Sequence, residues 1–179
     1  KIFKFFRNIF FILILKSLWK RLSNHIKAKK IIHLLKDAAK RTGNPVIIYV
    51  SVFDYYTKIP QRPNHIFEIL SERGFPSVVC SSKKQVISPY ENLFVIPSKT
   101  LKYILNGDFP KVFYVSFGFP YRDISNFSKY LNSDTLVIYE LIDDFDLLFD
   151  SKIINKAKQL FSDLVKRDKT FVLASANSL

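Results

Sequence analysis

Four carboxylates follow the apolar run Thr135–Tyr139, and they are the side chains best placed for chemistry. They stand within seven residues, at Glu140, Asp143, Asp144 and Asp146. Grouped carboxylates can act as a general base, hold the hydroxyl groups of a polyol or bind a divalent cation. The structural alternative is that Asp143 and Asp144 cap the next helix, whose amino end favours negative charge.

A second candidate site is the segment Ile59–His65, which carries an arginine between two prolines. Pro63 suits an early position in a helix, and the free backbone N–H groups at such a helix end attract anions. Arg62 adds a guanidinium that can hold a phosphate through two hydrogen bonds. The structural alternative is a turn in which Arg62 pairs with Asp54 or another local acid.

Motifs of several common enzyme classes are absent from the sequence. There is no G-x-G-x-x-G, no G-x-x-x-x-G-K-[ST] and no G-x-S-x-G, which argues against dinucleotide-dependent dehydrogenases, P-loop NTPases and α/β-hydrolases. The single cysteine, Cys80, excludes an internal disulfide and a zinc site with two thiolates, and it fits a reducing compartment. The three histidines stand apart from any cysteine or carboxylate cluster, so the sequence predicts no metal site.

Short apolar runs alternate with helical patterns from residue 46 onward. Strands are predicted at 46–52, 77–80, 93–96, 112–116, 135–139 and 171–174, and helices at 62–73, 98–106, 123–131 and 151–166. This alternation predicts an α/β fold with a Rossmann-like, mostly parallel sheet and helices on both faces. Because ligands bind outside the carboxyl ends of such strands, we expect Arg62 and the aspartate pair to line one groove.

The positive charge is concentrated at one end of the chain. The formal net charge is +13, and residues 1–41 hold twelve Lys or Arg with one acid, Asp37. Helical spacing at residues 22–41 ends at Thr42-Gly43-Asn44-Pro45, where glycine can cap a helix and proline cannot continue it. The sequence therefore predicts a basic, apolar helical appendage at 1–43 and a nearly neutral domain at 44–179.

The first twenty-two residues indicate the partner of this appendage. Basic residues flank the uninterrupted apolar run Ile9–Leu15, and Trp19 stands near its edge. Nucleic-acid arms are more polar than this, whereas lipid surfaces attract such a pattern, so we expect an anionic membrane surface as the partner and no nucleic acid. Seven apolar residues are too few to span a bilayer. The alternatives are a helix packed on the domain or on a missing partner, a secretory signal and a truncated transmembrane helix.

Motifs in the domain allow a comparison with a known enzyme family. Gln61-Arg62-Pro63-Asn64-His65, followed by Ile69–Phe75, is similar to an opening that reads QRP and then RGH. Val137–Asp144 is similar to VVYDxxDD, and Lys169–Leu179 to ADLVxxxSxxL. In this order the motifs, over about residues 46–179, resemble bacterial GT-B glycosyltransferases of the family-four-like type that builds capsules, O-antigens and teichuronic acids. Glu140 stands where aspartate is common, and Phe53–Lys58 replaces the Gly-Gly loop of many such enzymes.

The resemblance implies an enzyme that moves a sugar from a nucleotide-sugar to a cell-surface glycan or lipid-linked acceptor. The chain would be a piece of it, the N-terminal, acceptor-side domain without the C-terminal donor domain. The nucleotide-sugar is a substrate, and neither a cofactor nor a catalytic metal is implied. The implied location is cytoplasmic, peripheral on the inner face of the plasma membrane. The alternative function is a non-catalytic α/β binding or scaffold domain that is recruited to a membrane.

The resemblance also implies roles for particular residues of this sequence. Gln61 and Arg62 would lie near the donor phosphates, and Asp143 or Asp144 would face the acceptor hydroxyl as the catalytic carboxylate. The implied acceptor-binding residues are Ser116, Phe117, Tyr121 and Glu140.

Overall fold

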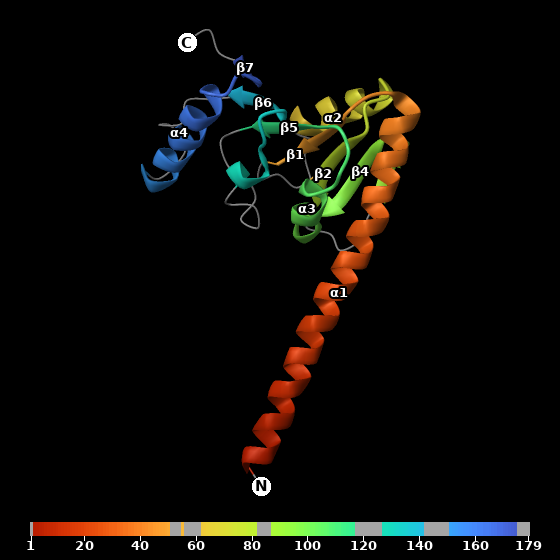
Figure 1. The fold of residues 1–179 in the computed structure, drawn as a ribbon, viewed down its shortest axis with the longest axis vertical. Coiled ribbons are helices and arrows are strands. Elements are labelled where there is room, and N and C mark those ends of the chain that lie inside the picture. The colour runs from red at the N-terminus through yellow and green to blue at the C-terminus, as the bar shows by residue number, and fades with distance from the viewer. Residues whose placement is uncertain are drawn as a thin grey trace.

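The computed structural model describes residues 2–50, 55, 62–81, 87–116, 127–141 and 151–174. The helices are α1 (Ile2–Thr42), α2 (Arg62–Glu72), α3 (Ser98–Leu105) and α4 (Ser151–Val165), with a 3-10 helix, η2, at Phe127–Tyr130. The strands are β1 (Val46–Tyr49), β2 (Ser77–Ser81), β3 (Ile87–Tyr90), β4 (Leu93–Pro97), β5 (Lys111–Ser116), β6 (Leu136–Leu141) and β7 (Thr170–Ala174). These elements alternate along the chain much as the sequence predicts (Figure 1).

The strands form one seven-stranded sheet in the order β3-β4-β2-β1-β5-β6-β7. All neighbouring strands pair in parallel except β3, which is antiparallel to β4 at one edge. The predicted α/β, Rossmann-like, mostly parallel sheet is therefore confirmed. The strand β3, which has four residues and contains Pro89, was not predicted from the sequence. Proline lacks a backbone donor and is tolerated at a sheet edge, where β3 lies.

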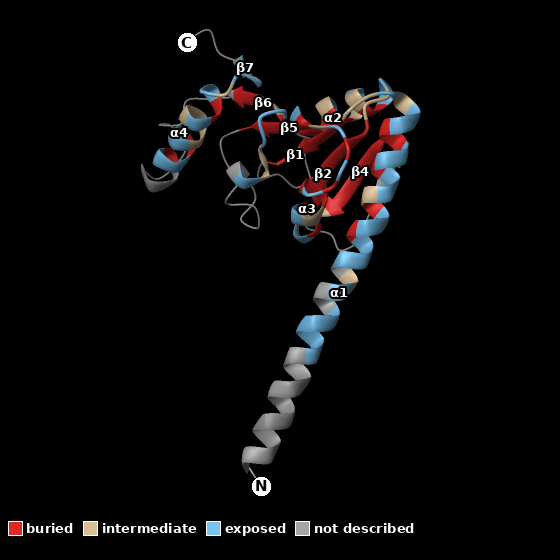
Figure 2. Ribbon diagram, viewed as in Figure 1, coloured by how far each residue is buried: buried red, intermediate tan, exposed pale blue. Residues whose placement is uncertain are grey.

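Helices cover both faces of the sheet, and each face has its own apolar cluster. Side chains alternate between the two faces along a strand. Val46 and Ile48 of β1, with Val50 just after it, therefore pack on the face that α1, α3 and α4 cover. Ile47 and Tyr49 pack on the face that α2 covers. Figure 2 shows β1, β2, β4, β5 and β6 as mostly buried, whereas the edge strand β7 is mostly exposed. The nearly continuous apolar runs of β1, β2 and β4 follow from this cover on both sides.

The helix α1 has two parts with different surroundings. Its carboxyl part belongs to the core through the buried residues Ala28, Ile31, Leu35, Ala38 and Ala39, whereas the rest projects away from the domain (Figure 1). The predicted domain boundary between residues 43 and 44 stays a prediction. The carboxyl part of α1, which precedes this boundary, packs against the sheet. Within the described residues, no helix combines the length and the apolar character needed to cross a membrane.

Two predicted helix ends are confirmed by backbone geometry. Gly43 and Gly74 have φ angles of 70° and 82°, a region that glycine enters without the penalty of a side chain. After α2, the N–H of Gly74 donates to Ser71 O at 3.0 Å and that of Phe75 donates to Leu70 O at 2.9 Å, which forms a Schellman cap. The helix predicted at 123–131 is the short 3-10 helix η2 over Phe127–Tyr130, while residues 123–126 lie outside the described residues.

Candidate functional site

The candidate site lies where the strand order reverses, at the carboxyl ends of β1, β5 and β6. From β1 the chain adds β2 and β4 on one side of the sheet, and β5, β6 and β7 lie on the other. The register pairs Tyr49 with Tyr114, and Ser116 with Glu140, across neighbouring strands. These four side chains point to the face that α2 covers, because they share one parity along their strands. Open parallel sheets bind their ligands at such a reversal.

An ion pair joins the first residue of α2 to the end of β6. Arg62 Nε lies 2.9 Å from Glu140 Oε1, although the two residues are 78 positions apart in the sequence. The Glu140 side chain is 1% exposed and the Arg62 side chain is 54% exposed, so the pair runs from the interior to the surface. Neither Glu140 oxygen has regular hydrogen-bond geometry with a described residue. The contact is therefore mainly electrostatic.

Two tyrosines and a serine surround the buried end of the pair. The hydroxyls of Tyr49 and Ser116 are hydrogen-bonded to each other inside the protein. Burial raises the pKa of Tyr114, and the nearby Glu140 carboxylate raises it further, while Arg62 opposes this shift. The Tyr114 phenol therefore stays neutral near physiological pH, with the Glu140 carboxylate nearby.

Polar contacts fix the position at which α2 begins. The buried Asn64 side chain donates to Tyr55 O at 2.8 Å, and Tyr55 OH donates to Glu68 Oε1 at 2.9 Å. The Tyr55 N–H donates to Cys80 O at 3.0 Å, which ties it to β2. These contacts hold the first turn of α2 over the sheet, so the backbone just after Arg62 is anchored.

The structure brings together three of the residues selected from the sequence. Arg62 contacts Glu140, and Ser116 lies beside Glu140 on the neighbouring strand. Ser116 and Glu140 are both buried, whereas Arg62 reaches the surface. The other candidates, Gln61, Phe117, Tyr121, Asp143 and Asp144, lie outside the described residues, as does Asp54. The proposed roles of all these residues stay predictions.

Tyr49 and Tyr114, which complete the cluster, were not predicted from the sequence as site residues. Both stand in apolar strands, where an aromatic residue is usually part of the core. They do pack in the core, with ring centroids 5.9 Å apart. The alternation of faces along β1 and β5 is the signal that could have placed their hydroxyls beside Ser116 and Glu140.

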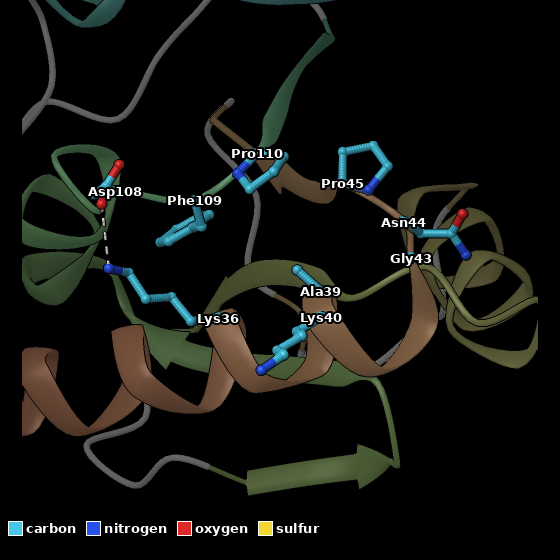
Figure 3. Close-up of a pocket in the computed structure, with 9 residues that line it drawn as sticks. All are labelled: Lys36, Ala39, Lys40, Gly43, Asn44, Pro45, Asp108, Phe109 and Pro110. Carbon is cyan, nitrogen blue, oxygen red and sulfur yellow. Dashed lines mark hydrogen bonds and ion pairs between the residues drawn. The ribbon is translucent and has the colours of Figure 1, made fainter.

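A cavity of about 430 Å³ lies at the opposite, amino edge of the sheet. Figure 3 shows its lining, which comes from the end of α1, from the residues before β1 and from the residues before β5. The lining residues are Lys36, Ala39, Lys40, Gly43, Asn44, Pro45, Asp108, Phe109 and Pro110. We call it the amino-edge cavity. It is separate from the polar cluster, because it lies at the other end of the strands.

Within the described part of the chain, no three His, Cys, Asp or Glu side chains are close enough to hold a metal ion. Searches of protein-family models, curated proteins and solved structures gave no match to this chain. The fold and the polar cluster are therefore the features that bear on function.

The arrangement is best suited to anion recognition beside a buried carboxylate. Glu140 orients the guanidinium of Arg62, and the backbone N–H groups in the first turn of α2 lie at the same place. Charge-assisted hydrogen bonds from arginine to phosphate are stronger than neutral ones. A ligand phosphate at this edge would bind to Arg62 directly. Glu140 would affect the phosphate only by holding the Arg62 guanidinium in position.

Proposed function

We propose that this domain is the acceptor-side part of a membrane-associated glycosyltransferase that uses a nucleotide-sugar donor. The observation that carries the proposal is the Arg62–Glu140 ion pair at the reversal of a parallel sheet. A diphosphate needs an oriented cation at a place that solvent reaches, and Arg62 meets both requirements. The resemblance of residues 61–75 and 137–144 to GT-B enzymes supports the same assignment.

In this proposal Arg62, together with Gln61, holds the donor phosphates, and Glu140 keeps the guanidinium in position. Glu140 and Ser116 are buried, so we propose that they shape the site from below rather than bind the sugar acceptor by themselves. The acceptor would contact Phe117 and Tyr121, and Asp143 or Asp144 would accept the proton of its attacking hydroxyl. No cofactor and no catalytic metal enter this scheme.

The membrane partner follows from the other end of the chain. The basic and apolar α1 would bind an anionic bilayer and hold the domain at the cytoplasmic face, beside a lipid-linked acceptor. A transferase domain and a membrane-binding helix would then occur in one chain because the helix brings the domain to its acceptor.

The test is sugar transfer by the protein made from its complete gene. Membranes that contain it are incubated with radiolabelled uridine- and guanosine-diphosphate sugars, and incorporation into lipid-linked product is measured. We expect Arg62→Ala to lower kcat/KM about 10-fold to 100-fold, the loss typical of a charge-assisted hydrogen bond.

The matched control is Arg73→Ala, which removes an exposed arginine just after α2. It should leave transfer within about twofold, because surface substitutions away from a site have small effects. Transfer by Arg62→Ala at the rate of the unchanged protein would refute the role of Arg62. The absence of transfer with every donor sugar in the unchanged protein would refute the enzyme assignment.

A second candidate function is a non-catalytic binding or scaffold domain recruited to a membrane. The burial of Glu140 and its pairing with Arg62 favour this reading, because a neutralised pair can serve the fold alone. Uridine diphosphate distinguishes the two functions. Protection of the Arg62 region from hydrogen exchange by this nucleotide supports the enzyme, and no protection supports the scaffold.

A further inference from the structure

Five apolar side chains form an exposed row on α1. We call this row, Leu15, Leu18, Trp19, Leu22 and Ile26, the outward stripe. Each of its members is about half exposed or more, and Trp19 reaches 74%. The spacing of three and four residues places them on one face of the helix. An exposed apolar row of this kind marks an interaction surface.

The outward stripe points away from the domain. At about 100° per residue, its mean direction differs by about 160° from that of the core-facing residues of α1. Those residues are Ala28, Ile31, Leu35, Ala38 and Ala39. The domain therefore packs on one side of α1 and leaves the stripe available on the other side.

The charges around the outward stripe match an anionic bilayer. Lys16, Lys20 and Arg21 lie beside it in the sequence, and residues 27–41 add six basic residues with one acid. Interfacial helices combine an apolar row with lysines and arginines in this way, because the row enters the acyl boundary and the cations meet headgroups. The occupant of this surface is therefore an anionic lipid bilayer.

Two lysines that line the amino-edge cavity, Lys36 and Lys40, lie along the same line of the helix as the outward stripe. Lys36 stands 18 residues after Leu18, and Lys40 stands 18 residues after Leu22. Eighteen residues make about five turns, so each lysine repeats the direction of its leucine about 27 Å farther along α1. A helix that lies on a bilayer with its stripe inserted thus brings both lysines to the headgroups.

The lining of the cavity suits a phosphate that is attached to a less polar group. Lys36 and Lys40 supply cations, and Phe109, Pro45 and Pro110 form apolar walls (Figure 3). The Lys36 ammonium lies 3.4 Å from the Asp108 carboxylate, while Lys40 has no ion pair with a described residue.

We propose that the amino-edge cavity receives the phosphate headgroup of an anionic phospholipid when the outward stripe is inserted in the bilayer. The inference uses the membrane association proposed above and is independent of sugar transfer. It adds a headgroup site at residues 36–45 and 108–110 to an anchor that the sequence placed in the first twenty-two residues.

The test is binding of the 179-residue chain to lipid vesicles, followed by the fluorescence of Trp19, the single tryptophan. Vesicles contain phosphatidylcholine alone or phosphatidylcholine with phosphatidylglycerol. We expect binding and a blue shift of the emission only with phosphatidylglycerol. The double variant Lys36→Gln/Lys40→Gln should bind about 30-fold more weakly, since each lysine near an anionic surface contributes to the attraction.

The control is Lys156→Gln/Lys166→Gln, which removes two exposed charges from the opposite end of the domain and should change binding less than about threefold. Equal weakening by both double variants would refute the cavity and indicate a diffuse effect of net charge. Chemical-shift changes at Asn44 with free glycerol phosphate as large as those with vesicles would also refute a lipid ligand. No binding of the unchanged chain to either vesicle would refute membrane association itself.

Discussion

The Arg62–Glu140 ion pair gives the sharpest prediction about the site, because one partner is buried and the other is half exposed. Replacing Arg62 by alanine leaves the Glu140 carboxylate inside the protein without its cation. Replacing Glu140 by glutamine removes the charge and keeps the shape of the side chain. Neither change alone measures the interaction, but the two single variants and the double variant form a thermodynamic cycle that does.

The expected coupling follows from the geometry. At a separation of 2.9 Å, Coulomb's law gives about 1.4 kcal/mol at the dielectric constant of water and about 6 kcal/mol at an effective value of 20. Because water reaches Arg62 and not Glu140, we expect a coupling near the lower end, about 2 kcal/mol. In a protein of this size, that energy corresponds to a shift of about 4–8 °C in Tm.

The assay is urea unfolding followed by far-ultraviolet circular dichroism. Arg62→Ala should lower the free energy of unfolding by about 2–3 kcal/mol, and adding Glu140→Gln to it should cause little further loss. Arg73→Ala is again the control, with an expected change below about 0.5 kcal/mol. If the two single changes simply add in the double variant, the pair does not hold Arg62, and the reasoning about the site fails.

Three other predictions concern the core, a helix cap and the tyrosines. Leu35→Ala should cost about 3 kcal/mol in urea unfolding, whereas Leu34→Ala on the exposed side should cost less than about 0.5, because only Leu35 is enclosed. Gly43→Ala should cost about 1 kcal/mol in the same assay through its φ of 70° alone, since no atom lies within 4 Å of an added Cβ. Burial raises the pKa of Tyr114 and Tyr139, so above about pH 10 the folded state binds more protons than the unfolded state and stability falls as pH rises. An alkaline titration of phenolate absorbance should therefore show a group of tyrosines that ionises only on unfolding, and complete ionisation of the folded protein would contradict this.

Most strands of the sheet could be predicted from the sequence, because buried parallel strands are nearly continuous runs of β-branched and aromatic residues. The edge strand β3 was not predicted, because its four residues include a proline and carry little apolar character. The helix ends at Gly43 and Gly74 were predictable from the need for a left-handed backbone. Pro45, two residues after Gly43, strengthened the pattern at the first of these ends.

The site was predictable only in outline. The rule that ligands bind at the carboxyl ends of parallel strands selected Ser116 and Glu140, and the helix start at Pro63 selected Arg62. The structure brings these three residues together. The partner of Arg62 was not predictable, because pattern and spacing do not say which of fifteen acids lies near a given cation. The contributions of Tyr49 and Tyr114 depend on the register between strands, which emerges only when the sheet is assembled.

The unbroken course of α1 from Ile2 to Thr42 constrains the protein in one further way. A single residue inserted between Ile26 and Ala28 would rotate everything before it by about 100° and turn its apolar row toward the plane of the sheet. Insertions of seven, eleven or eighteen residues would nearly restore the original phase. The length of α1 is therefore constrained to changes that keep the helical phase. The type of polar residue at its exposed positions is constrained much less.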